Sequence, residues 1–269
     1  MPPLIAVEEV SRVFAGGART VTALERVSFE IETGNFVSIV GPSGCGKSTL
    51  LKIISGLLPA SSGQIQVNGK RVDQPLENVG MVFQSPVLLK WRSVLGNILL
   101  PVEFAKLDPA SHLQKAQALI KLVGLEGFEE MYPHELSGGM QQRAALVRAL
   151  SYKPSVLLMD EPFGALDAFT REEMNHLVEE IWLDTRTTIV LITHSIEEAI
   201  FLSDRIVVMS PRPGRVASIH QVPFPRPRSL EIMSTKEVFD LTNAIKLEIV
   251  GTQQSRYPAR AASIQPAAQ

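Results

Sequence analysis

The segment Gly41–Thr49, GPSGCGKST, constrains the fold of this chain more than any other feature. It fits the pattern GxxxxGK[ST] and stands between the apolar run Asn35–Val40 and the run Lys47–Leu58, whose leucines and isoleucines have helical spacing. Glycines in such a loop allow positive φ angles, so that backbone amides can point at phosphate oxygens, and the following helix directs its positive end to the same place. The sequence therefore predicts a strand–loop–helix unit that binds a nucleotide. This context disfavours the alternative, a glycine-rich turn without a chemical role.

Each part of this phosphate loop, residues 41–49, has an expected task. The amides of residues 44–47 would face the phosphates, Lys47 would neutralise the β- and γ-phosphates, and the Ser48 hydroxyl would be a ligand of Mg²⁺. We interpret Cys45 as a small filler rather than a redox switch. The residues expected to contact ATP here are Gly41, Pro42, Ser43, Gly44, Cys45, Gly46, Lys47, Ser48 and Thr49.

Composition excludes several classes of protein. The 269 residues are 45% hydrophobic and 20% charged, which indicates one large globular domain or two small ones rather than a disordered chain. The net charge of −2 argues against a generally basic nucleic-acid binder. Cys45 is the single cysteine, so an internal disulfide is excluded and a reducing compartment is favoured. Neither a signal-peptide pattern nor an apolar run of about 18 residues is found, so we expect a cytoplasmic protein that reaches a membrane only through a partner.

The order of periodic segments predicts the fold class. Strands are expected at 4–14, 21–31, 35–40, 64–67, 79–83, 156–159, 188–193 and 205–209. Helical patterns dominate residues 94–150, and the longest later helix is expected at 170–185. Strands that alternate with helices predict an α/β fold with a mostly parallel sheet, and the helical middle predicts an inserted subdomain. The last 19 residues lack periodicity and are expected to form a frayed tail.

A second acidic motif follows a buried strand. Val156–Glu161, VLLMDE, is an apolar run that ends in two carboxylates. Asp160 could hold Mg²⁺ opposite Ser48, and Glu161 could then polarise the water that attacks the γ-phosphate. Alone, such a pair would more often be an ordinary charged strand exit, but the phosphate loop in the same chain favours the catalytic interpretation.

The segment Leu136–Arg143, LSGGMQQR, identifies a family. Together with the phosphate loop, the Asp160–Glu161 pair and the downstream His194, it resembles the signature of ATP-binding cassette (ABC) ATPases, and the resemblance covers residues 4 to about 228. It implies a P-loop NTPase (RecA-like) core with an N-terminal antiparallel β part and an inserted α-helical subdomain. The implied divisions are a first core part at 1–88, the helical signature subdomain at 89–153, a second core part at 154–230, and a C-terminal helix with a tail at 231–269.

The resemblance also implies a composite site in a head-to-tail dimer. In ABC proteins the signature meets the ATP held by a second copy, so Ser137, Gly138 and Gly139 are expected to lie near the γ-phosphate of the partner's site; independently, free amides at the start of a helix form an anion site. Further positions match the family's motifs. They are Gln84 as the Q-loop glutamine that senses Mg²⁺ and the permease, His194 as the switch histidine, Asp167 of the D-loop, and Phe14 as an aromatic ring on adenine. A packed strand-end histidine and a core phenylalanine are the alternatives for His194 and Phe14.

Three kinds of machine are compatible with an isolated cassette: a transporter subunit that works with separate permease chains, a soluble ABC ATPase acting on DNA or the ribosome, and an unrelated P-loop kinase. A kinase has no use for the signature, and the chain lacks the heptads and cysteine clusters usual in DNA-repair members. Transport is therefore favoured. No nucleic-acid partner is expected.

Finer features resemble the importer ATPases of the nitrate, sulfonate and taurine group. They are residues 85–91, SPVLLKW, where Lys90 replaces a common proline, and the segments 210–216 and 223–228, which could also be proline-rich turns at strand ends. Membership implies permease subunits, an indirectly associated solute-binding protein and a peripheral place on the cytoplasmic face of the inner membrane. Val87, Leu88, Leu89 and Trp91 are expected to line the permease groove, with core packing as the rival explanation.

Overall fold

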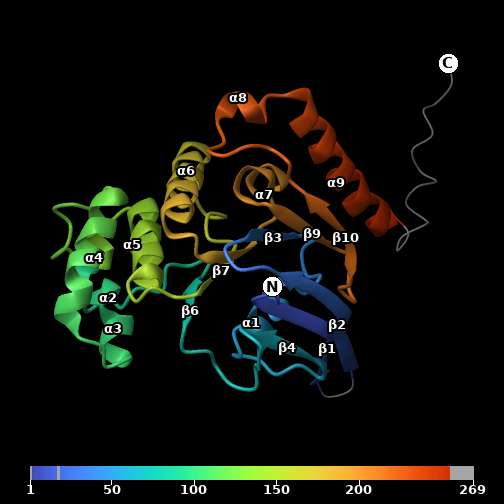
Figure 1. Cartoon of the computed structure of the whole chain (residues 1–269), viewed down its shortest axis with the longest axis horizontal. Helices are drawn as coiled ribbons and strands as arrows, with labels where there is room; N and C mark the ends of the chain where they lie inside the picture. The colour runs from blue at the N-terminus through green and yellow to red at the C-terminus, as the bar shows by residue number, and fades with distance from the viewer. Residues whose placement is uncertain (1, 17–18, 255–269) are drawn as a thin grey trace. The chain divides into compact units, whose positions relative to one another are not determined.

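The computed structural model describes residues 2–16 and 19–254, and the chain divides into two compact units (Figure 1). The first unit comprises residues 1–32, 37–75 and 194–269 as far as they are described, and the second comprises residues 33–36 and 76–193. The boundaries expected from the sequence, after residues 88, 153 and 230, divide the chain differently and stay a prediction.

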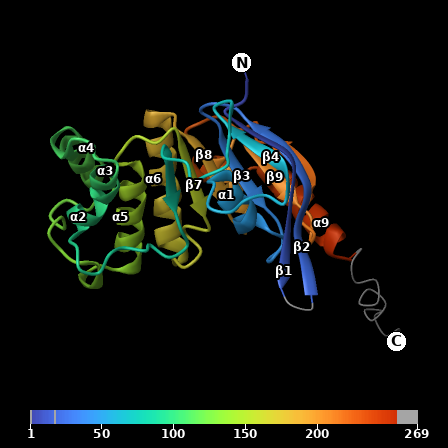
Figure 2. The same cartoon turned by 90° about the horizontal axis from the view of Figure 1, so that it is seen from below.

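The first unit begins with an antiparallel sheet in the order β2-β1-β4-β5. Its strands are β1 (Ile5–Gly16), β2 (Arg19–Ile31), β4 (Ser62–Val67) and β5 (Lys70–Arg71). Figure 2 shows β1 and β2 as long neighbouring strands, and their pairing runs from Ile5 opposite Ile31 to Gly16 opposite Arg19. The sequence did not predict β5, because a two-residue strand carries no periodicity.

A second group of strands in this unit has the order β10-β9-β3. β3 (Phe36–Val40) runs parallel to β9 (Arg205–Met209), and β9 pairs antiparallel with β10 (Val216–Gln221). All five side chains of β3 are buried, which suits a strand covered on both faces. The phosphate loop follows β3 directly and leads into helix α1 (Lys47–Ile54).

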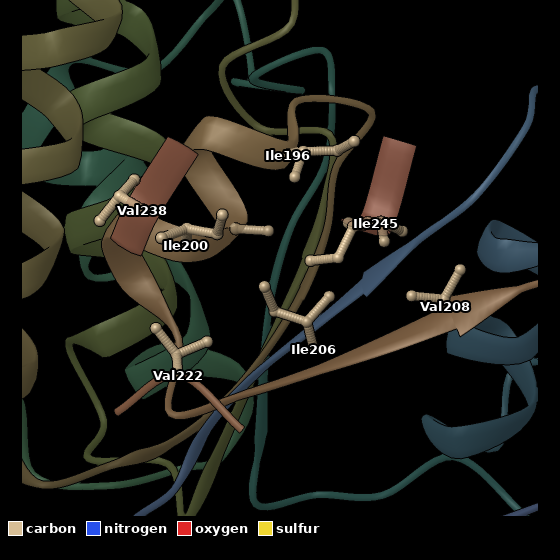
Figure 3. Close-up of a cluster of buried hydrophobic side chains, with 9 residues drawn as sticks. Ile196, Ile200, Ile206, Val208, Val222, Val238 and Ile245 are labelled. Carbon is tan, nitrogen blue, oxygen red and sulfur yellow. The ribbon is translucent and has the colours of Figure 1, made fainter. Parts of the chain in front are cut away.

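Three more helices complete the first unit: α7 (Ile196–Leu202), α8 (Leu230–Met233) and α9 (Lys236–Gln254). Figure 3 shows the apolar cluster that joins them to the strands, with Ile196 and Ile200 of α7, Ile206 and Val208 of β9, and Val238 of α9 among its members. α9 contributes Val238 and Ile245 to this cluster, so burial of its apolar side chains holds the helix in place.

The connection from β10 to α8, residues 223–228, ties this cluster to α7 through two arginines. The Arg228 side chain is 2% exposed, and its guanidinium donates hydrogen bonds to the carbonyls of Ile200, Phe201 and Ser203 at 2.7–2.8 Å. Arg226 donates to Asp204 at 3.0 Å. The guanidinium of Arg228 thereby satisfies carbonyls at the carboxyl end of α7 that the helix itself leaves without partners.

The second unit contains three parallel strands in the order β8-β7-β6. They are β6 (Val79–Val82), β7 (Val156–Asp160) and β8 (Thr188–Ile192), and the long helix α6 (Ala168–Thr185) connects β7 to β8. Helices α2 (Val94–Ile98), α3 (Leu100–Phe104), α4 (Pro109–Leu122) and α5 (Gly138–Leu150) gather together in Figure 1, and a short 3₁₀ turn, η1 (Pro133–Glu135), precedes α5.

Two predicted element ends are wrong. The helix expected at 47–58 ends at Ile54, because Gly56 adopts φ +77 and lies so close to Gln74 that a Cβ would be 2.1 Å from its carbonyl oxygen. The frayed tail expected from residue 251 is wrong for its first four residues, because α9 continues to Gln254; the other residues of that prediction lie outside the described residues. None of the described helices is both long enough and apolar enough to span a bilayer.

Candidate functional site

The phosphate loop is held in a shape that requires glycine. Gly46 is the N-cap of α1 with φ +109, and a Cβ there would lie 2.7 Å from Leu24 Cδ2 and 3.0 Å from the Ala23 carbonyl oxygen. Gly44 also has positive φ, at 74°. L-amino acids with a side chain rarely adopt such angles, so the glycines allow the loop to lie against β2. The start of α1 has no side-chain cap, which leaves its amides for a ligand.

Lys47 places a buried cation inside this loop. Its side chain is 5% exposed, and Nζ donates to the carbonyl oxygens of Gly41 at 2.8 Å and Pro42 at 3.2 Å. These partners are neutral, whereas buried charges in proteins are usually paired with an opposite charge. A triphosphate in the loop would provide that charge, so the residues present fit ATP.

The neighbouring cysteine has a different character. Cys45 is 1% exposed, and burial raises the pKa of its thiol, although the charge of Lys47 partly opposes this shift. The thiol is therefore protonated at neutral pH, as expected for a small apolar filler.

His194 and Phe14 are the other predicted site residues in the first unit. His194 is exposed and stands immediately before α7, whose N-cap Ser195 accepts a hydrogen bond from the Glu198 amide at 3.1 Å. Phe14 lies on β1 and is 39% exposed, with the Arg12 guanidinium 4.7 Å from its ring centroid. Neither side chain belongs to the buried core, so the packing alternative for each is wrong.

In the second unit, the acidic pair follows β7 as the sequence predicted. Asp160 is the last residue of the strand, and Glu161 comes next with φ +46 and an amide that donates to the Ile192 carbonyl at 2.9 Å. A left-handed conformation costs a glutamate energy, and such strain clusters at functional sites.

The signature residues form an open helix start. Ser137 caps α5, and its Oγ accepts a hydrogen bond from the Met140 amide at 3.2 Å. Ser137 and Gly138 are exposed, and a Cβ on Gly138 would meet no atom within 4 Å. The hydroxyl proton of Ser137 and the first amides of α5 can therefore reach an anion that approaches from outside.

Gln84 and Asp167 are exposed at the ends of other elements of the second unit. Gln84 follows β6, and Asp167 caps α6 by accepting hydrogen bonds from the Thr170 amide at 3.0 Å and hydroxyl at 2.8 Å. These bonds to Thr170 lower the pKa of Asp167, which keeps its carboxylate ionised.

Two residues of α5 that sequence analysis missed connect the signature to the segment after β6. Gln142, 1% exposed, donates to the Phe83 carbonyl at 3.0 Å, while Arg148 donates to the carbonyls of Val87 at 2.7 Å and Pro86 at 2.8 Å. Gln142 lies within the signature motif itself, which was the available signal; nothing local marks Arg148.

The described residues contain no cluster of three His, Cys, Asp or Glu side chains suited to a metal. A hydroxyl, an amide oxygen and one or two carboxylates, completed by phosphate and water, are instead what Mg²⁺ uses beside a nucleotide. Ser48 in the first unit and Gln84 and Asp160 in the second carry oxygens of these kinds.

Comparison with known proteins decides the family. The family model described as "ABC transporter" matches residues 24–164. The chain belongs to the ABC transporter family. The taurine import ATP-binding protein TauB of Rhizobium johnstonii is 49% identical to this cassette over 224 residues, which are 83% of this chain and 86% of the relative. The aliphatic sulfonates import ATP-binding protein SsuB of Bacillus cereus is 44% identical over 234 residues, or 87% and 92% of the two chains.

Solved structures agree with the fold of the ABC cassette. A dimeric ATP-binding cassette in a post-hydrolysis state bound to ADP and Pi matches with a TM-score of 0.73 at 30% identity, over 82% of this chain and all of that one. The cbiO1 protein of Clostridium perfringens, part of an ABC transporter complex, matches with a TM-score of 0.74 at 27% identity, over 97% and 98% of the two chains. The predicted α/β P-loop NTPase fold is thereby confirmed.

Proposed function

We propose that this ABC ATPase hydrolyses ATP at two composite sites of a head-to-tail dimer and thereby drives import of a small solute through separate permease subunits. The observation that carries the proposal is the buried Lys47 ammonium, whose hydrogen-bond partners in the phosphate loop are neutral carbonyls. The open helix start at Ser137 supports the dimer, because its own chain's phosphate loop already serves one ATP.

Hydrolysis of ATP depends mainly on positioning the reacting groups and on stabilising the charge of the phosphates. Lys47 would hold the β- and γ-phosphates, and Glu161 would accept a proton from the attacking water. His194 would donate a hydrogen bond to the γ-phosphate. Ser48, Gln84 and Asp160 would hold Mg²⁺, which would supply positive charge to offset the charge of the phosphates.

Contacts from both copies to one γ-phosphate would link hydrolysis to movement. Ser137, Gly138, Gly139 and Asp167 of one copy would meet the nucleotide of the other, and Phe14 would stack on adenine. The dimer would close when ATP binds and open once the bond to the γ-phosphate is hydrolysed, as in other proteins whose conformation depends on a γ-phosphate.

A permease would receive this movement at the segment that follows β6. Trp91 is 74% exposed and Val87 is 57% exposed, whereas Leu88 and Leu89 are half-buried. Trp91 and Val87 are therefore the proposed contact residues. Arg148 binds the backbone of Val87, so a displacement here would be passed to the signature helix. The protein would accordingly be peripheral on the cytoplasmic face of the membrane.

The solute class follows from the relatives, which are named for import of taurine and aliphatic sulfonates. We propose a small solute of this kind, delivered by a solute-binding protein. These names favour import over the alternative, a soluble ABC ATPase that acts on DNA or the ribosome.

The decisive experiment measures association. A Glu161→Gln variant saturated with Mg-ATP should sediment as a dimer and return to monomer with Mg-ADP, while Lys47→Ala in the same background should stay monomeric with either. A strictly monomeric Glu161→Gln protein at high concentration, with ATP demonstrably bound, would refute the composite site.

A further inference from the structure

The turn between β9 and β10, residues 210–215, packs against the phosphate loop. The Gly214 amide donates to the Ala23 carbonyl at 2.9 Å, and its carbonyl accepts from the Glu25 amide at 3.0 Å, so the turn is fixed on β2. Within the turn, Ser210 pairs with Arg215 through its own amide at 2.9 Å and accepts from the Arg215 amide through its hydroxyl at 3.1 Å. Hydrogen bonds to β2 and within the turn therefore hold this segment in one conformation.

Two consecutive peptide groups of the phosphate loop point their carbonyls toward this turn. The Gly44 carbonyl accepts a hydrogen bond from Arg212 Nε at 3.1 Å. The Cys45 carbonyl lies so close to Gly214 that a Cβ on that glycine would be 2.0 Å from the oxygen. In a trans peptide the N–H points opposite to the C=O. The amides of Cys45 and Gly46 must therefore point away from the turn.

The Cys45 amide points to the side of the loop on which the Lys47 ammonium lies. The Cys45 amide makes a 3.3 Å hydrogen bond to the Pro42 carbonyl, which is also the carbonyl that accepts from Lys47 Nζ at 3.2 Å. The amide and the ammonium thus converge on one place inside the loop.

We propose that Arg212 is a positioning residue for nucleotide binding, which holds the Gly44 carbonyl outward so that the Cys45 amide faces the phosphates. The proposal rests on nucleotide binding at the phosphate loop. Both phosphates of ADP would use these amides, so Arg212 serves ADP and ATP alike. It does not touch the γ-phosphate and has no part in the hydrolysis step.

Arg215 provides a matched control on the same turn. Its guanidinium pairs with Glu25 at 2.8 Å, and both side chains are substantially exposed. Such surface pairs contribute little, and this guanidinium bonds to Glu25 of β2 rather than to a carbonyl of the phosphate loop. Arg215→Ala therefore removes an equal charge from the same turn and leaves the Gly44 carbonyl in place.

The test measures binding of Mg-ADP and of a non-hydrolysable ATP analogue by titration calorimetry, together with kcat at saturating ATP. Arg212→Ala should weaken binding of both nucleotides by the same factor, about three- to tenfold, as expected for the loss of one exposed hydrogen bond. kcat and the melting temperature should stay unchanged, Arg212→Lys should restore part of the affinity, and Arg215→Ala should match the parent protein.

Unchanged affinity in Arg212→Ala would overturn the proposal, and so would an equal loss in Arg215→Ala. A loss confined to the ATP analogue would also overturn it, since this would indicate a direct γ-phosphate contact. Lys47→Ala is measured alongside: if it binds both nucleotides normally, the failure lies with the proposed site itself rather than with Arg212.

Discussion

The chain contains two helix starts that suit a phosphate, and they are built in opposite ways. At α1, Gly46 is crowded by Leu24 and Ala23, and the buried Lys47 lies inside the loop. At α5, Ser137 caps the helix, and Gly138 has open space around the position of its missing side chain. The first helix start is enclosed by its own chain, whereas the second is exposed. One copy alone could therefore enclose an anion at the first helix start, whereas in the proposed dimer the second would meet the anion held by another copy.

The largest effect is expected from a variant that leaves both helix starts unchanged and stops hydrolysis. Glu161→Gln preserves size and removes the carboxylate, so ATP should bind normally and turnover should fall by about 10²–10⁴-fold, the usual contribution of a general base. Phosphate release measures turnover, and calorimetry measures binding. Asp184→Asn, on the surface of α6, is a matched control that should turn over like the parent. Near-normal turnover in Glu161→Gln would remove this residue from the role of base.

Alanine at one glycine of each helix start tests the difference directly. Gly46→Ala forces a side chain into a left-handed conformation, which costs about 1–2 kcal/mol, and pushes it against Leu24. ATP binding should fall more than tenfold, and the protein should melt at a lower temperature.

Gly138→Ala should behave in the reverse manner. The methyl group meets nothing in its own chain and improves helix propensity, so stability and ATP binding of the monomer should be unchanged or slightly better. Dimer-dependent hydrolysis should nevertheless fall by more than about tenfold, because the methyl group displaces the second copy's phosphate. Equal behaviour of the two variants in monomer binding would abolish the distinction between enclosed and exposed helix starts.

Ser137→Ala isolates the cap from the open surface. Loss of the hydrogen bond from the Met140 amide should destabilise α5 by about 1 kcal/mol, which a chemical denaturation midpoint can detect. Ser137→Asn restores a capping oxygen and should recover the stability. Activity should not recover with it if the serine hydroxyl also donates to a phosphate.

The sequence predicted the enclosed helix start well because its parts are contiguous. Strand, loop and helix stand within residues 35–54, and the glycine spacing alone indicates the chemistry. The support behind the loop could not be predicted, since Gly44 and Arg212 are 168 residues apart and meet only in the folded sheet. Gln142 lies in the signature motif, but its partner Phe83 could not be predicted for the same reason, since the two residues are 59 positions apart. The left-handed conformation of Glu161 was also missed, because a glutamate rarely adopts positive φ and its residue type does not indicate it.

Cys45 offers the mildest test of the enclosed helix start, since only its backbone would serve the nucleotide. Cys45→Ala should change the affinity for ADP by less than about twofold while lowering stability modestly, as for removal of a small buried apolar group. In the parent protein, burial raises the pKa of the thiol, so little thiolate exists at pH 7.5 and a maleimide should react far more slowly than with free cysteine.

Ser137→Cys placed in the Cys45→Ala protein should react rapidly, because that position is exposed. Addition of Mg-ATP to a Glu161→Gln version should then protect the new thiol, since the second copy would cover it. Fast labelling of Cys45 itself would mean that the loop opens often, and the first helix start would no longer count as enclosed.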